Sequence, residues 1–72
     1  MQFSELAEIL TGHIKRETME DGTVRLATIK TFRLAQKGAE DEDDRLACER
    51  AINELMTSQM SERLKAELET LG

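Results

Sequence analysis

The sequence predicts an all-α fold, with three or four helices in a single domain that spans residues 1–72. The apolar residues are mostly Ala, Leu, Ile and Met, and the polar ones are rich in Glu, Arg and Lys, which are good helix formers. The chain also contains no proline, tyrosine or tryptophan. All-β domains normally use these residues for turns and for packing across strands.

The first predicted helix covers residues 3–18. Gln2 or Ser4 can cap its start, and one helical face carries apolar residues at spacings of three and four: Phe3, Leu6, Ala7, Leu10 and Ile14. An interior glycine costs a helix about 1 kcal/mol relative to alanine. Gly12 therefore leaves open a shorter helix that ends at Thr11.

The segment after the turn at residues 19–22 is ambiguous. A helix over residues 23–37 is favoured, because apolar residues recur at helical spacing: Leu26, Ile29, Phe32 and Ala35. Gly38 then suits the C′ position just beyond the helix. The alternative is an α+β fold with a β-hairpin at about residues 14–34, because Thr23, Val24, Thr28 and Ile29 favour strands.

The clearest helical patterns lie in the C-terminal part of the chain, at residues 43–57 and 61–71. Ser61 can cap the second of these helices. No proline or glycine separates the two, so one long helix over residues 43–71 is nearly as well supported.

The net charge of −5 is unevenly distributed. Residues 22–38 contain no acidic residue but four cations: Arg25, Lys30, Arg33 and Lys37. On a helix, three of these would share a face and could contact DNA phosphates. A small transcriptional regulator is therefore an alternative function, although the acidic whole argues against strong non-specific nucleic-acid binding.

No pattern of residues predicts an enzyme, a cofactor or a metal site. His13 has no nucleophile at a recognisable spacing. Cys48 lies within an apolar stripe, where a free cysteine packs as a small hydrophobe. The acidic run at residues 40–44 lacks the spacing of a calcium loop, and we interpret it as a solvated helix start.

We expect a non-enzymatic protein-interaction module in the cytoplasm, with no membrane segment. A chain of 72 residues with a single cysteine has no disulfide to support its small core. A second copy of the chain or another protein would therefore cover the surplus apolar surface of the C-terminal helices. The expected contact residues in this homodimeric regulator or adaptor are Met56, Met60, Leu64, Leu68 and Leu71.

Overall fold

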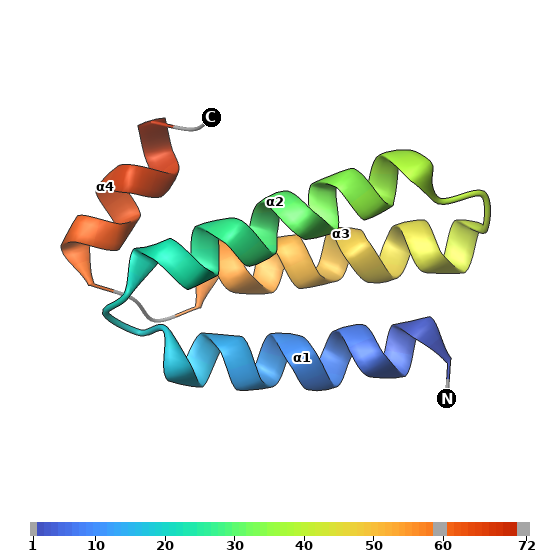
Figure 1. Ribbon diagram of the computed structural model, residues 1–72, viewed down its shortest axis with the longest axis horizontal. Helices are drawn as coiled ribbons and strands as arrows, with labels where there is room; N and C mark the ends of the chain where they lie inside the picture. Colours follow the sequence, from blue (N-terminus) through green and yellow to red (C-terminus); the bar gives the residue numbers. More distant parts are fainter. Residues whose placement is uncertain (1, 59–60, 71–72) are drawn as a thin grey trace.

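The computed structural model describes residues 2–58 and 61–70, except for the side chain of residue 68. It contains four helices, α1 (Phe3–Glu17), α2 (Gly22–Gly38), α3 (Glu42–Thr57) and α4 (Glu62–Thr70). The first three run alternately up and down, and α4 crosses the end of this bundle beside the start of α2 (Figure 1). The predicted all-α fold is confirmed, and the alternative hairpin at residues 14–34 is wrong.

Side chains at the turns fix where α2 and α3 begin. The carboxylate of Asp21 accepts a hydrogen bond from the Thr23 amide at 3.0 Å, and Asp41 accepts one from the Asp43 amide at 2.9 Å. Each aspartate thereby satisfies an amide that has no partner within its helix. The strand-favouring residues at the start of α2 thus follow an effective helix cap, and the helix forms despite their intrinsic preference.

Two predicted helix boundaries need correction. The possible single helix over residues 43–71 is wrong, because α3 ends at Thr57 and Ser58 is its C-cap. As predicted, Ser61 caps α4 by accepting a hydrogen bond from the Leu64 amide at 3.2 Å. Gly38 is the last residue of α2 rather than its C′ residue, and no glycine in the described part of the chain has a positive φ.

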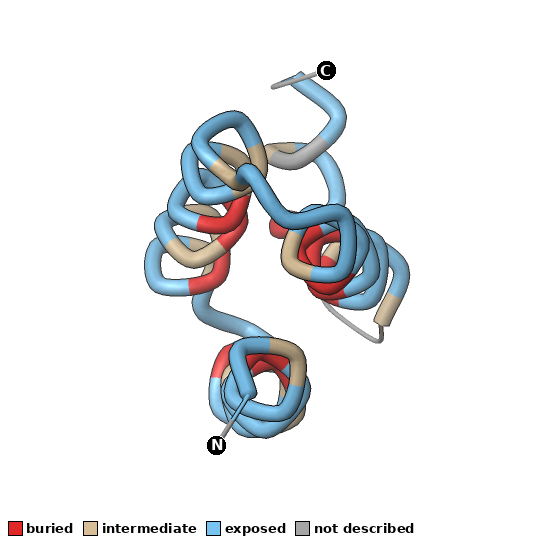
Figure 2. Tube along the Cα trace, turned by 90° about the vertical axis from the view of Figure 1, so that its right-hand side faces the viewer, coloured by how far each residue is buried: buried red, intermediate tan, exposed pale blue. Residues whose placement is uncertain are grey.

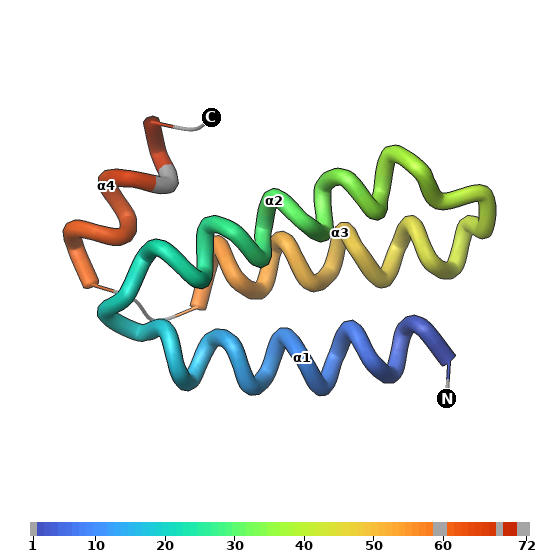
Figure 3. Tube along the Cα trace, in the orientation of Figure 1, coloured from blue at the N-terminus to red at the C-terminus, as the bar shows by residue number. Residues whose placement is uncertain are grey.

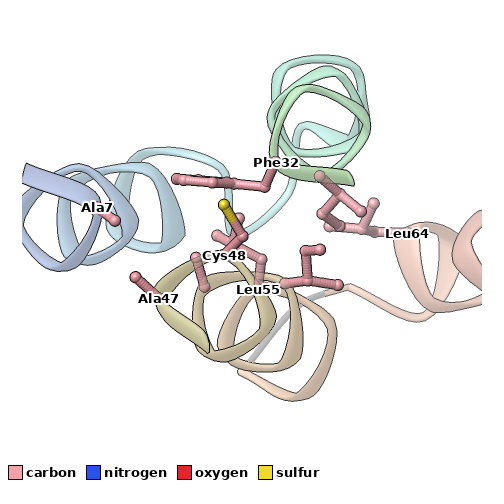
Figure 4. Close-up of a cluster of buried hydrophobic side chains, with 9 residues drawn as sticks. Ala7, Phe32, Ala47, Cys48, Leu55 and Leu64 are labelled. Carbon is pink, nitrogen blue, oxygen red and sulfur yellow. The ribbon is translucent and has the colours of Figure 1, made fainter. Parts of the chain in front are cut away.

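The core lies mainly along α3, which packs against both α1 and α2 (Figures 2 and 3). Helix α3 supplies five of its buried residues, Ala47, Cys48, Ala51, Ile52 and Leu55. The sulfur of Cys48 points toward the ring of Phe32 from α2, while Ala7 of α1 approaches Ala47 (Figure 4). Helix α1 therefore meets α3 through small residues, and α2 meets it through larger ones.

The start of α2 is closely covered by α4. Leu64 is 1% exposed and packs into the core, and the Ser61 amide donates a 2.9 Å hydrogen bond to the carbonyl of Met19. A Cβ atom on Gly22 would lie 2.7 Å from a Leu64 methyl group and 2.7 Å from the Glu67 carboxylate. Glycine at position 22 therefore allows α4 to lie against α2.

Gly22→Ala is expected to destabilise the protein by about 1 kcal/mol, because the buried Leu64 side chain must shift to make room for the added methyl group. Gly38→Ala is the matched control, because no atom lies within 4 Å of its added Cβ. This control should be neutral or stabilise by up to about 1 kcal/mol. Urea denaturation followed by circular dichroism measures both, and equal stability of the two variants would contradict the close packing of α4.

Candidate interaction surface

Arg25 is the one cation of the basic segment that the structure places inside the molecule. It is 0% exposed, and its guanidinium donates four hydrogen bonds. Two go to main-chain carbonyls, Lys15 in the last turn of α1 at 2.8 Å and Leu55 in the last turn of α3 at 3.2 Å. The other two go to the hydroxyl groups of Thr18 at 2.9 Å and Ser58 at 3.0 Å.

This arrangement accounts for a buried cation that has no carboxylate among its hydrogen-bond partners. The last carbonyls of a helix lack partners within the helix and carry the negative end of its dipole. The Arg25 guanidinium meets two such helix ends together, so partial negative charge faces it from α1 and from α3. Burial still lowers the pKa of Arg25 from its usual value, but arginine titrates so far above neutrality that it keeps its charge.

The expectation that Arg25 belongs to a DNA-contacting surface is therefore wrong. The N–H groups of its guanidinium donate to groups inside the protein, so they cannot contact a phosphate. Lys30 and Lys37 are exposed, whereas Arg33 is half-buried and donates to the Met56 sulfur at 3.8 Å. These three residues lie on one side of α2, so the structure leaves a smaller basic patch than the sequence predicts.

Of the predicted contact residues on the C-terminal helices, Leu64 is not available to a partner. Leu64 is buried between α4 and α2, and Met56 is half-buried against the core. The side chains of Met60, Leu68 and Leu71 lie outside the described residues. The apolar stripe of α3 is thus used within the subunit, because α1 and α2 cover it.

The exposed apolar surface lies instead on α1. Four large side chains that are 36–61% exposed form a patch that we call the α1 face: Phe3, Leu6, Ile9 and Leu10. At 100° per residue they span about 120° of the helix surface. The buried residues of α1 lie on another side of the helix, where Ala7 and Thr11 meet α3.

The sequence predicts that the apolar residues of this helix pack together on one face, but the structure exposes most of them. Phe3, Leu6 and Leu10 share a predicted apolar face with Ala7 and Ile14, yet the close contact with α3 uses the smaller side chains of that helix. Small residues let two helix backbones approach, so Ala7 opposite Ala47 fixes how α1 is rotated. That rotation turns the leucines of α1 outward.

A groove of about 580 Å³ runs beside this α1–α3 contact. Its walls include Glu8 and Arg50, and the Lys15–Glu54 ion pair at 3.4 Å also joins the two helices. Thr11 lines the groove with a buried hydroxyl oxygen that has no hydrogen-bond partner among the described residues. The groove carries charges of both signs and polar groups, which distinguishes it from the apolar α1 face.

The structure also places the other residues that the sequence analysis considered for chemistry, namely the cysteine, the acidic run and the histidine. Among the described residues no cluster of three His, Cys, Asp or Glu side chains could hold a metal ion. Cys48 is buried, and both burial and the nearby Asp44 carboxylate raise the pKa of its thiol. In the acidic run, Asp41 caps α3 and Glu42 forms an ion pair with Arg45 at 3.6 Å. His13 is exposed on α1.

No protein-family model, curated protein or solved structure matches this chain. In the part of the chain that the structure describes, none of the helices is both long enough and apolar enough to cross a membrane.

Replacing Arg25 is expected to cost much more stability than replacing an exposed cation of the same helix. Arg25→Met leaves the buried Leu55 carbonyl and the partly buried Lys15 carbonyl without this donor, at about 1–3 kcal/mol for a buried group, so we expect a loss of about 3 kcal/mol. Arg25→Lys should recover only part of this loss, because one ammonium cannot match the arginine fork. Lys30→Met is the control and should change stability by less than about 0.5 kcal/mol. Chemical denaturation of the three variants measures these differences, and similar losses at positions 25 and 30 would contradict the role of Arg25.

The buried thiol predicts that stability falls at alkaline pH. The pKa of Cys48 is raised in the folded protein. The stabilisation that the protonated thiol contributes is therefore complete below the pKa of the unfolded chain, about 8.5, and is lost as the pH rises through the folded pKa. Cys48→Ala removes this group, and the slope of unfolding free energy between about pH 8 and 10 should become shallower. Denaturation series at several pH values test this, and an unchanged slope would contradict the assignment.

Proposed function

We propose that this protein is a small, non-enzymatic protein-interaction module, a regulator or adaptor that binds its partner through the α1 face. The observation that carries the proposal is the gathering of Phe3, Leu6, Ile9 and Leu10 at the surface of one helix. Small soluble domains generally bury such side chains, and contiguous apolar patches mark sites where another molecule binds.

The packing of the other helices supports this location. Most apolar residues of α3 already have partners, since Ile52, Leu55 and Cys48 are buried within the subunit, whereas Leu46 is 38% exposed. Elsewhere in the described chain the exposed large apolar residues are more scattered, as with Leu34, which is 70% exposed on α2. A cytoplasmic location accords with this proposal, because a free thiol is typical of proteins in that reducing compartment.

The double substitution Leu6→Glu and Leu10→Glu is expected to abolish partner binding and to leave the fold intact. Both side chains are about half exposed, and glutamate is as good a helix former as leucine, so the loss of stability should be below about 1 kcal/mol. The measurement is retention of a partner from an extract of the source cells by the immobilised wild type and by the variant, each checked by circular dichroism.

Leu34→Glu provides the matched control, because it places the same charge on an exposed leucine outside the α1 face. A partner retained by the wild type and by Leu34→Glu, but not by the double variant, supports the proposal. Equal retention by all three proteins would contradict a role for the α1 face.

A further inference from the structure

Helix α2 carries a second surface, which shares no residue with the α1 face. Leu34 is 70% exposed, the largest value for any large apolar side chain in the described part of the chain. Lys30 precedes it by four residues and Lys37 follows it by three, so both cations are its neighbours on the helix. We call these three residues and Arg33 the α2 patch. At 100° per residue they occupy about 100° of the helix surface and about 10 Å of its length.

The cations of the α2 patch have no anionic partner among the described residues. Lys30 and Lys37 are exposed and form no ion pair there. Within the same part of the chain, Arg33 donates only to the Met56 sulfur at 3.8 Å, and a thioether sulfur is a weak acceptor. The Arg33 guanidinium therefore keeps donors that can pair with both oxygens of a carboxylate.

The neighbouring helices balance their charges, whereas α2 does not. Arg45 of α3 pairs with Glu42 at 3.6 Å, and Arg63 of α4 pairs with Glu67 at 3.7 Å. Helix α2 contains no acidic residue, so its cations cannot be balanced in this way. The whole chain carries a net charge of −5, so the positive charge of the α2 patch is a local feature. Cations around an exposed leucine are complementary to a ligand that is both anionic and apolar.

We propose that the α2 patch binds an acidic segment of a partner protein, in which carboxylates flank an apolar side chain. The apolar side chain contacts Leu34, and carboxylates about one helical turn to either side meet Lys30 and Lys37. This inference goes beyond the proposed function and does not depend on it. Because the α2 patch and the α1 face have no residue in common, one molecule can hold a partner at each.

Duplex DNA fits the α2 patch less well than an acidic protein segment does. Three cations neutralise few phosphates, and the affinity of phosphate contacts grows with their number. The rest of the protein is acidic, so DNA repels it. Leu34 would also find no apolar partner on a phosphate backbone. The protein segment uses all four residues of the α2 patch, whereas DNA would use only its cations.

The test measures the dissociation constant of a fluorescein-labelled helical peptide by fluorescence anisotropy. The peptide carries leucines on one side, each with a glutamate one turn before and after it, and a second peptide has glutamine in place of glutamate. A few exposed charge pairs and one leucine predict a constant on the order of 0.1 mM for the glutamate peptide. The glutamine peptide should bind at least about tenfold more weakly, because it retains the apolar contact but loses the charge pairs.

Lys30→Glu with Lys37→Glu should raise the constant of the glutamate peptide at least about tenfold, because attraction becomes repulsion. Arg16→Glu with Lys65→Glu is the matched control, because it makes the same change of net charge at exposed positions outside the α2 patch. This control should stay within about threefold of the wild type. Leu34→Gln should raise the constant at least about threefold, because it removes the apolar contact and retains the cations. Circular dichroism checks that each variant is folded.

Preference for the glutamate peptide, with losses confined to the variants of the α2 patch, supports the proposal. No binding of the glutamate peptide at about 1 mM protein overturns it, and so does equal binding of the two peptides. Equal losses in the two double variants overturn it because only net charge would then matter, and a Leu34→Gln protein that binds like the wild type overturns it as well. A labelled DNA duplex that binds the wild type more tightly than the glutamate peptide overturns it in favour of a nucleic-acid surface.

Discussion

The fold depends on the Arg25 guanidinium, which holds together the ends of three helices. Its side chain starts on α2 and reaches the last-turn carbonyls of both α1 and α3. Removing a charge from water is costly, and here the opposing partial charges come from two helix dipoles and two hydroxyl groups. One arginine thereby supplies the cross-link that a chain with a single cysteine cannot obtain from a disulfide. Helix α4 packs against the same end of the bundle. Its Leu64 side chain is buried there, and the Ser61 amide bonds to the carbonyl of Met19 in the turn before α2.

Close packing at one side of α1 accounts for exposure at the other. Ala7 and Thr11 bring the backbone of α1 near α3, and the Lys15–Glu54 pair adds a contact along their seam. A helix that buries small residues must turn its larger ones elsewhere, and α2 covers little of α1. The patch we propose as a binding surface therefore follows from the way the core is built.

The helices were predictable from the sequence because their caps and apolar spacing agree, as Ser61 illustrates. It was harder to predict which face of each helix packs into the core and which face is exposed. Arg25 stands at helical spacing from Ile29 and Phe32, a signal that places it on the buried side of α2, but composition alone groups it with the surface cations. The choice between Ala7 and Leu6 as the packing residue of α1 depends on how closely α3 approaches. That distance is set by residues 40 positions further along the chain, such as Ala47, and cannot be obtained from the pattern of α1 itself.

The exchange of the Arg25 side-chain protons with water tests the central claim most directly. In a ¹⁵N-labelled sample at neutral pH, Nε–H of an exposed arginine such as Arg16 exchanges rapidly with solvent. Four hydrogen bonds within a fully buried site predict a shifted Arg25 Nε–H signal that exchanges far more slowly, together with separate signals from its two hindered Nη groups. Exchange of Arg25 as fast as that of Arg16, with averaged Nη signals, would contradict an arginine that joins the helix ends.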